Sequence, residues 1–299
     1  MMKNYKGVYS ALMTPFKADG SVDFDALKRL ADFCIDSGLS GLYVGGSTGE
    51  GFLLTEEERM EVFRVVGKHM AGKCNLFAHV GAISTDSAIR MAKVAEESGF
   101  DAVSAVAPFY YSFPLEAIKT YYSDIMHATS LPMLMYNFPN AGGFNGMLDV
   151  VNSFIDDDKL LGIKHTSQNL FELEMFKHLQ RELIVFNGFD EMLVAGLAMG
   201  ADGGIGSTYN FMPKIILDIF NNFNAGDIRA AQKAQEKANR IIEAMMPYGV
   251  FQMEKEILKN LGVPVGSAEN RSCRFPTRAA PKRKKSPLLY NLEVRKWLI

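Results

Sequence analysis

Short apolar runs alternate with longer amphipathic segments, and this pattern repeats eight times along the first three quarters of the chain. The apolar runs are Gly7–Pro15, Gly41–Gly46, Leu76–Gly81, Ala102–Ala107, Pro132–Asn137, Leu160–Lys164, Leu183–Asn187 and Gly203–Gly206. The segments with helical spacing are Phe24–Ser37, Thr55–Met70, Ser84–Ser98, Leu115–Thr129, Met147–Ile155, Leu170–Leu179, Asp190–Met199 and Pro213–Phe223. Runs that are apolar throughout are typical of parallel strands covered on both faces. Eight such units predict an α/β fold with a closed (β/α)8 TIM barrel over about residues 7–225, and an open doubly wound sheet is the alternative.

Helix starts support this interpretation. Thr55 is followed three residues later by a glutamate, which is the pattern of a capping box. Ser84 and Asp86 begin the next helical segment in the same manner.

The chain continues past the eighth unit. The helical stretches Asp227–Met246 and Phe251–Leu261 predict a C-terminal helical extension over about residues 226–262, within a single domain. The tail, residues 265–299, has nine Lys and Arg against two Glu, a balance of +7 that leaves −9 for the rest of a chain with net charge −2. The run Lys282-Arg283-Lys284-Lys285 suits a solvated terminus or an electrostatic contact with an acidic partner, and no function is drawn from it.

Composition narrows the class of protein. With 299 residues, 48% of them hydrophobic, the chain can bury a substantial core. A net charge of −2 gives no reason to expect nucleic acid or a membrane as the main partner. Cys34, Cys74 and Cys273 are widely spaced, odd in number and in no metal-ligand pattern, which suits a reducing compartment. No apolar leader or long apolar stretch is present, so we expect a cytoplasmic location.

Reactive groups in barrels of this type lie at the carboxyl ends of the strands and in the loops that follow. The polar residues at the ends of the proposed second, fifth, sixth, seventh and eighth strands are Ser47-Thr48-Gly49-Glu50, Tyr136, Lys164-His165-Thr166, Gly188-Phe189-Asp190-Glu191 and Ser207. The fold predicts that they face one mouth.

Lys164 ends an apolar strand with no obvious carboxylate beside it. Desolvation of a buried ammonium lowers its pKa toward neutrality. A neutral amine attacks a ketone to form a Schiff base, which then acts as an electron sink. The structural alternative is a lysine whose ammonium extends into solvent at the strand end.

Tyr136 ends the neighbouring strand, where its phenol can relay a proton to and from a substrate hydroxyl. A tyrosine in this position is otherwise a packing residue with a satisfied hydroxyl.

The turn Gly45–Gly51 is rich in glycine. Its hydroxyls and exposed N–H groups suit a carboxylate, the group that every α-keto acid presents. It fits neither a Walker loop nor the dinucleotide spacing of three glycines. A plain tight turn is the alternative.

Asp190 and Glu191 follow the seventh strand, where they can accept hydrogen bonds from the hydroxyls of a polyol or sugar. Acidic residues also stabilise the first turn of a helix, which explains them equally well. His165 directly follows Lys164, so it points to the opposite face of the strand and is interpreted as structural.

The histidines give little support to a metal-dependent aldolase with Zn²⁺. They show no close pairing with each other or with carboxylates, and are His69, His79, His127, His165 and His178.

Three ordered motifs resemble those of the pyruvate-dependent class I aldolases, the family that includes N-acetylneuraminate lyases and dihydrodipicolinate synthases. They are Gly46-Ser47-Thr48-Gly49-Glu50, Tyr136-Asn137-Phe138-Pro139 and Gly162-Ile163-Lys164. The likeness runs from about Gly7 to Gly262, and the tail beyond Gly266 departs from the pattern. The resemblance implies a barrel with extra C-terminal helices, a homotetramer, a Schiff base at Lys164, a proton relay through Tyr136, and no cofactor.

Within this family the chain resembles the sialic acid branch. Ser47 stands where the synthases usually carry threonine, and Lys164 is followed by His165-Thr166-Ser167 where they tend to have Glu-Ala. The resemblance assigns Ser47 and Thr48 to the pyruvate carboxylate. It implies that the sugar chain is bound by Thr166, Gly188, Asp190, Glu191 and Ser207. It makes Tyr110 the tyrosine that reaches a neighbouring subunit's site, so the expected catalytic set is Lys164, Tyr136, Ser47 and Tyr110.

The expected reaction is the reversible aldol cleavage of N-acetylneuraminate to N-acetylmannosamine and pyruvate. The synthases carry an arginine after the Tyr-Asn-x-Pro segment to hold a second carboxylate, but Asn140–Gly143 contains no cation. Phe138 and Asn140 are not the commonest residues there, which bears on substrate detail. Alternatives are an aldolase or dehydratase for another 2-keto-3-deoxy sugar acid, a dihydrodipicolinate synthase, and a silent sensor that binds a keto acid or sugar.

Overall fold

The computed structural model describes residues 3–141 and 143–266. Its strands close into one parallel barrel, in which each strand pairs with the next along the chain and β8 pairs with β1. The strands are β1 (Gly7–Ala11), β2 (Gly41–Val44), β3 (Asn75–His79), β4 (Ala102–Val106), β5 (Met133–Asn137), β6 (Leu160–His165), β7 (Ile184–Asn187) and β8 (Gly203–Gly206). The closed order confirms the predicted (β/α)8 barrel and excludes the open doubly wound sheet.

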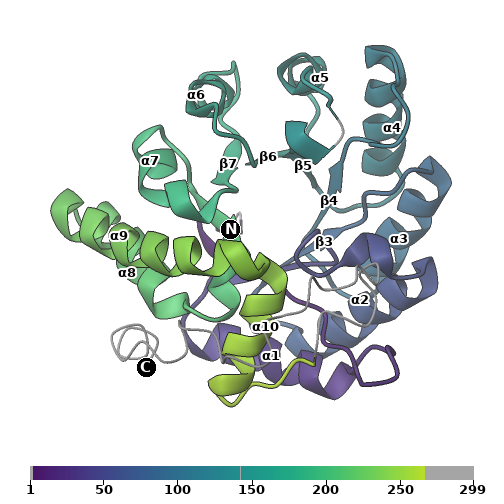
Figure 1. Ribbon diagram of the computed structural model, residues 1–299. Helices are drawn as coiled ribbons and strands as arrows, with labels where there is room; N and C mark the ends of the chain where they lie inside the picture. The colour runs from purple at the N-terminus through teal and green to yellow at the C-terminus, as the bar shows by residue number, and fades with distance from the viewer. Residues whose placement is uncertain (1–2, 142, 267–299) are drawn as a thin grey trace.

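Helices follow the strands and surround the barrel (Figure 1). The outer helices are α1 (Phe24–Asp36), α2 (Glu56–Met70), α3 (Thr85–Glu97), α4 (Leu115–His127), α5 (Met147–Ser153), α6 (Leu170–Lys177), α7 (Leu193–Ala198) and α8 (Pro213–Asn224). Short 3-10 helices are η1 (Gly51–Leu53), η2 (Pro139–Ala141), η3 (Asp190–Met192), η4 (Thr208–Asn210) and η5 (Met246–Tyr248).

The predicted C-terminal extension is present as α9 (Ile228–Met245) and α10 (Val250–Asn260). α9 packs along α8, and α10 packs against η4, the short helix that follows β8 (Figure 1). The extension therefore reaches back to the carboxyl ends of the strands. Residues 267–299, which include the basic run Lys282–Lys285 and Cys273, lie outside the described residues.

The inside of the barrel is filled by side chains. This interior cluster consists of Tyr9, Ala11, Tyr43, Phe77, Ala102, Leu134, Phe186 and Ile205. Tyr9 stacks on Phe77 with ring centres 4.8 Å apart and meets Phe186 edge-on at 5.2 Å. A second, larger cluster packs between the strands and the helices. Because the interior is closed, a reaction site has room only at the mouth.

The two predicted helix starts have different outcomes. Thr55 and Glu58 form a complete capping box at α2, as predicted. Ser84 occupies the N-cap position of α3, as predicted, but the expected capping by its side chain is wrong, because that side chain makes no capping hydrogen bond. Asp86 lies in the first turn, where it stabilises the helix dipole without such a bond.

The first apolar run is longer than its strand. β1 ends at Ala11, and the residues that follow continue as a buried loop beside the second strand. Thr14 in this loop donates a hydrogen bond of 2.6 Å to the carbonyl of Gly49. The run thus supports the turn that follows β2. Within the described ranges, no helix has the length and apolar character needed to cross a membrane.

Candidate active site at the carboxyl end of the barrel

Lys164 lies at the mouth of the barrel as the penultimate residue of β6, and only 5% of it is exposed. Its Nζ lies 4.3 Å from the centre of the Tyr43 ring and 4.4 Å from that of Tyr136. Burial lowers the pKa of Lys164 to about 7, and the negative charge of Asp190 opposes this only in part. The amine is therefore close to half neutral at pH 7 and able to act as a nucleophile.

Tyr136 is the register neighbour of Lys164 on β5 and is 3% exposed. Burial raises the pKa of Tyr136 to about 12, while the hydroxyls of Thr166 and Ser47 act in the opposite direction. The phenol therefore keeps its proton at neutral pH. Thr166 Oγ1 is buried and has no fully formed hydrogen bond among the described residues, so it remains available to a ligand.

The glycine-rich turn after β2 is held in an unusual backbone conformation. Gly45 has a φ of 77°, and Glu50 has a φ of 52°, which is rare for a residue with a side chain. Glu50 is fixed by Lys255 of α10, whose Nζ donates a 2.5 Å hydrogen bond to Oε1. Among the described residues, the N–H groups of Ser47 and Thr48 donate to no acceptor. Two free N–H groups on a fixed turn suit an anion.

Arg59 of α2, which no sequence motif singled out, supports this turn by donating to the carbonyl oxygen of Gly45 at 3.4 Å. Arg59 is 4% exposed and donates to the carbonyl oxygens of His79 at 2.6 Å and Gly81 at 3.0 Å. Burial lowers its pKa to about 10, and burial and this cation together keep the pKa of His79 well below its usual range. The available signal was an arginine on the same helical face as the buried Val62 and Phe63.

Asp190 faces the mouth from η3 and is 7% exposed. Its Oδ2 accepts hydrogen bonds of 2.8 Å from both the backbone N–H and the hydroxyl of Thr208. The carboxylate therefore binds the segment after β8 and does not cap its own helix. Burial raises the pKa of Asp190 to about 6.

Two glycines allow the polar side chains to approach the backbone closely. A Cβ at Gly188 would lie 1.9 Å from Thr166 Oγ1, and a Cβ at Gly206 would lie 1.9 Å from Asp190 Oδ1. Any larger residue at either place would displace a predicted ligand-binding group. The structure thus brings Lys164 together with residues from five strand ends, namely Ser47, Tyr136, Thr166, Gly188, Asp190 and Ser207.

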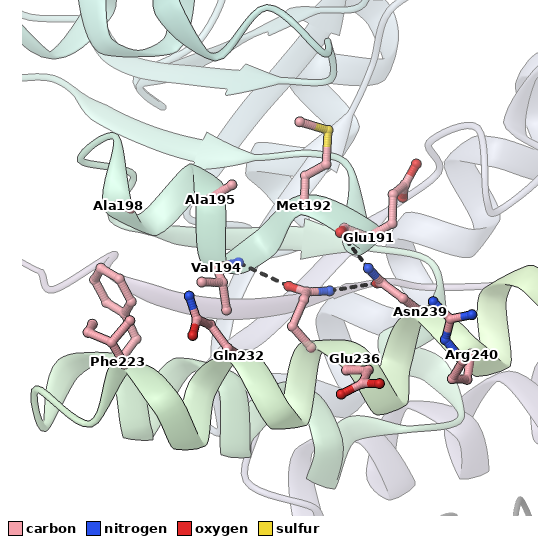
Figure 2. A pocket seen from close by; sticks show the side chains of 12 residues that line it. Glu191, Met192, Val194, Ala195, Ala198, Phe223, Gln232, Glu236, Asn239 and Arg240 are labelled. Atoms are coloured by element: carbon pink, nitrogen blue, oxygen red, sulfur yellow. Dashed lines mark hydrogen bonds between the residues drawn. The ribbon is translucent and has the colours of Figure 1, made fainter.

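Glu191 and Tyr110 lie apart from this group. Glu191 is exposed, and its carboxylate extends away from α9 (Figure 2). It lines an outer groove of about 760 Å³ between α7 and α9, and Lys164 does not line that groove. Tyr110 is 72% exposed and packs edge-on against Tyr111, with ring centres 4.8 Å apart.

His165 is structural, as predicted. It is fully buried, its ring lies 5.7 Å from that of Phe176 in α6, and its Nε2 lies 3.0 Å from the carbonyl oxygen of Asn169. Burial lowers its pKa to about 4, so it stays neutral. Over residues 3–141 and 143–266, no group of three or more His, Cys, Asp or Glu is arranged to hold a metal ion.

α10 also contributes to the mouth, which the sequence analysis did not expect. Phe251 and Gln252 line a cavity of about 330 Å³ together with Ser47 and Phe52. Glu254 and Lys255 on the same helix are buried polar residues. No local sequence signal connects this helix with the turn after β2, because the two are some 200 positions apart.

Comparison with known proteins agrees with this geometry. The sequence model of the Dihydrodipicolinate synthetase family matches residues 4–292. The match continues past Gly266, so the expectation that the likeness ends near Gly262 is wrong.

Individual relatives cover most of the chain. The N-acetylneuraminate lyase of Rhizobium meliloti is 40% identical over 262 residues, 87% of either chain. A Clostridium difficile protein solved in complex with mannosamine is 32% identical with a TM-score of 0.91, over 99% of this chain and 100% of that one. A catalytic lysine mutant of the sialic acid aldolase of Ruminococcus gnavus is 32% identical with a TM-score of 0.86, over 89% and 90% of the two chains.

Proposed function

Because this chain belongs to the dihydrodipicolinate synthetase family of pyruvate-dependent class I aldolases, we propose that it cleaves N-acetylneuraminate to N-acetylmannosamine and pyruvate. The observation that carries the proposal is the buried amine of Lys164, with a pKa of about 7, beside the phenol of Tyr136. The names of the relatives support the substrate: one is an N-acetylneuraminate lyase, and another is a sialic acid aldolase with a catalytic lysine.

The first step is condensation of the open-chain keto acid with Lys164. The substrate carboxylate binds the N–H groups and hydroxyls of Ser47 and Thr48, which places the ketone carbon at the amine. The neutral Nζ attacks this carbon, and the carbinolamine loses water to give a protonated Schiff base. The iminium nitrogen then serves as the electron sink, so the chemistry requires no cofactor.

The second step breaks the C3–C4 bond. Tyr136 is protonated in the resting site, so it accepts the C4 hydroxyl proton as it passes its own proton to Ser47. The hydroxyl hydrogen of Ser47 moves at the same time onto the substrate carboxylate that Ser47 binds. The C4–O electrons form the aldehyde of N-acetylmannosamine, and the C3–C4 electrons move into the iminium to give an enamine. The enamine takes up a proton at C3, returned from the carboxylate through Ser47 and Tyr136, and is hydrolysed by water, which releases pyruvate and restores Lys164.

The sugar chain lies on the other side of Lys164. Thr166, Asp190 and Ser207 offer hydroxyl and carboxylate groups to its hydroxyls, and Gly188 leaves room beside Thr166. Asp190 is partly committed to Thr208, so it has one oxygen left to accept a bond from the ligand. The resemblance assigns Glu191 to the far end of the chain, although its exposed side chain lines the groove between α7 and α9.

We also propose a homotetramer, in which Tyr110 completes a neighbouring subunit's relay. A tetramer with two-fold axes needs two different contact surfaces. One candidate is the exposed aromatic group of Tyr110, Tyr111 and Phe113, and the other is the groove between α7 and α9 (Figure 2). Light scattering coupled to gel filtration tests the assembly, and a monomer would contradict it.

We place the protein in the cytoplasm because Cys34 and Cys74 are free cysteines. Unpaired thiols persist in a reducing compartment. Exposure of cells to a membrane-impermeant thiol reagent, followed by fractionation, tests this location.

The proposed function is tested by a substrate panel and by trapping. Pyruvate release is measured from N-acetylneuraminate and from 2-keto-3-deoxygluconate, and we expect the former to have the higher kcat/KM. Pyruvate with borohydride should add a permanent mass to Lys164, which a silent binding protein would not acquire. Faster turnover of 2-keto-3-deoxygluconate, or formation of a dicarboxylate product from aspartate semialdehyde, would assign the site to another member of the family.

A further inference from the structure

Glu254 on α10 is a buried carboxyl group that the proposed mechanism does not use. The residue is 0% exposed, and neither Oε1 nor Oε2 has a fully formed hydrogen bond among the described residues. The groups that act on its carboxyl are the Ser207 hydroxyl after β8, the Asp190 carboxylate on η3 and the Lys255 ammonium on its own helix. Glu254 therefore lies behind the sugar side of the site.

The neighbouring cation does not neutralise Glu254. Lys255 Nζ is bound to Glu50 Oε1 at 2.5 Å and to the carbonyl oxygen of Thr14 at 3.1 Å. Its charge is thus paired at the other side of the mouth. A buried carboxylate without a partner is costly, so the group takes up a proton instead. Burial raises the pKa of Glu254 to about 8.

The protonation state of Glu254 controls what Ser207 can offer a ligand. A hydroxyl has one hydrogen to donate and two lone pairs. A neutral Glu254 would donate its O–H to the nearby Ser207 Oγ, a hydrogen bond that the resting structure does not fully form, and the serine hydrogen would then be free for a ligand oxygen. An ionised Glu254 accepts that hydrogen, so Ser207 then presents only lone pairs.

We propose that Glu254 is a positioning residue for the sugar chain, which holds the Ser207 hydroxyl as a hydrogen-bond donor toward a substrate hydroxyl. The inference rests on the proposed function, because that function assigns Ser207 to the sugar. It concerns only the sugar half of the reaction, since the pyruvate half binds at Ser47 and Lys164. An apolar residue at this position would pack without the desolvation of a carboxyl and would leave Ser207 without its partner.

The test compares Glu254→Gln and Glu254→Leu with Glu256→Gln, a matched control on the exposed face of the same helix. KM and kcat are measured from pH 6.5 to 9.5 for N-acetylneuraminate cleavage. In the reverse direction, KM is measured separately for pyruvate and for N-acetylmannosamine. Thermal melts record whether each variant is folded.

For the unchanged protein we expect KM for the sugar to rise about tenfold as the pH passes through 8, which is the effect of losing one hydrogen bond. KM for pyruvate should show no such alkaline rise. Glu254→Leu should show the high sugar KM at every pH and an unchanged or higher melting temperature. Glu254→Gln keeps a hydrogen-bond donor that does not titrate, so its KM for the sugar should not show the alkaline rise. Ser207→Ala should also lack it, and Glu256→Gln should retain it.

The inference is overturned if Glu254→Gln keeps the alkaline rise in KM for the sugar. It is equally overturned if Glu254→Leu has the same KM for the sugar as the unchanged protein at pH 7. It is also overturned if the variants raise KM for pyruvate and for the sugar equally, which indicates a general loss of structure. If the unchanged protein releases no pyruvate from N-acetylneuraminate, the proposed function fails and takes this inference with it. If the unchanged protein cleaves N-acetylneuraminate and the Glu254 variants have the same KM values, only this inference is rejected and the proposed function stands.

Discussion

Asp202 and Asp190 lie at opposite ends of the barrel, and their surroundings differ. Asp202 precedes β8 at the amino end, where its Oδ2 accepts bonds of 2.7 Å from Lys177 and 2.9 Å from the N–H of Val185. Its Oδ1 lies 3.1 Å from Lys6. These partners hold the pKa of Asp202 below its usual range despite the opposing effect of burial.

At the carboxyl end Lys255 and Glu50 form a buried pair, but three other buried groups have no ion-pair partner in the part of the chain that the structure describes, and of these only Asp190 has hydrogen bonds, from Thr208. Burial moves the pKa of Asp190 to about 6, that of Lys164 to about 7 and that of Glu254 to about 8. All three values lie near neutral pH, where the groups can exchange protons. The comparison shows that the amino end pairs its buried aspartate for stability, while the carboxyl end leaves Lys164, Asp190 and Glu254 without an ion-paired counter-charge among the described residues, which suits proton transfer.

The sharpest way to separate the two ends is to remove one lysine from each. Lys164→Met should lower kcat at least about 10⁴-fold and abolish the borohydride adduct. It should also raise the free energy of unfolding at pH 7 by roughly 2–4 kcal/mol, because no ammonium is then desolvated. The pKa of Lys164 is lower in the folded state, so the unfolded chain binds more protons between about pH 7 and 10. Stability of the unchanged protein therefore rises with pH across that window, and the variant should lose this slope in denaturant titrations.

Lys177→Met is the control at the amino end. It should keep kcat and lose about 1–3 kcal/mol of stability, since Asp202 loses a bond. If Lys164→Met cleaved the substrate at the normal rate, the lysine at the carboxyl end would have no catalytic role and the contrast between the two ends would fail.

A pair of tyrosines makes a milder version of this test. Tyr136→Phe should lower kcat by roughly 10²–10⁴ and still form the pyruvate adduct, because it removes only the proton relay. Tyr9 lies in the barrel interior toward the amino end and donates a 2.7 Å bond to the carbonyl of Tyr5. Tyr9→Phe should cost about 1–2 kcal/mol of stability and leave kcat unchanged. Equal losses of kcat in the two variants would show that both phenols only support packing.

The two aspartates themselves should respond in opposite directions. Asp202→Asn should lower the free energy of unfolding by about 2–4 kcal/mol, because it leaves Lys177 without its counter-charge and Lys6 with only Glu182, at 3.9 Å. The pKa of Asp202 is depressed, so its contribution is present above its unfolded pKa and is lost as the pH falls through the folded value. Asp190 has a raised pKa, so stability falls as the pH rises from about 4 to about 6.

Asp190→Asn should remove that loss of stability and raise KM for the sugar acid. Urea titrations at pH 4, 5, 6 and 7 measure the stability, and initial rates of pyruvate release against substrate concentration measure KM. If Asp190→Asn lowered the stability and Asp202→Asn left it unchanged, the roles of the two ends of the barrel would be reversed.

The pH dependence of Schiff base formation gives the smallest expected effect. The rate of pyruvate trapping should fall about tenfold per unit as the pH drops below 7, since only neutral Lys164 reacts. The charge of Asp190 raises the pKa of Lys164, so Asp190→Asn should move the midpoint of this profile to lower pH. A midpoint that stays in place or rises would show that Asp190 does not act on the amine.

Many residues of the site could be predicted from their positions at the ends of the apolar runs. Lys164 and Tyr136 were predicted to face one mouth because each ends an apolar run, and the register of β5 and β6 places them side by side. The roles assigned to them and to Ser47 stay predictions until the variants are measured. Local rules failed at Ser84, since an N-cap residue type does not guarantee that its side chain turns to the helix.

Other parts of the site had no local signal. Arg59 donates to the carbonyl oxygen of Gly45 in the turn after β2 from inside a helix whose sequence has no unusual feature. Glu254 and Lys255 reach the mouth only because α9 and α10 return to it after the barrel is complete. A contact between residues far apart in the chain cannot be predicted from the periodicity of either segment.

The sequence by itself determined the number and order of the strands and helices, because apolar periodicity is a local property of each segment. It also determined which polar residues end the strands, since that follows from position along each run. The tertiary structure alone decided which of these groups are buried, which are paired, and where their pKa values lie. Those properties depend on desolvation and charge summed over neighbours from many segments, and the closed barrel brings these neighbours together only after folding.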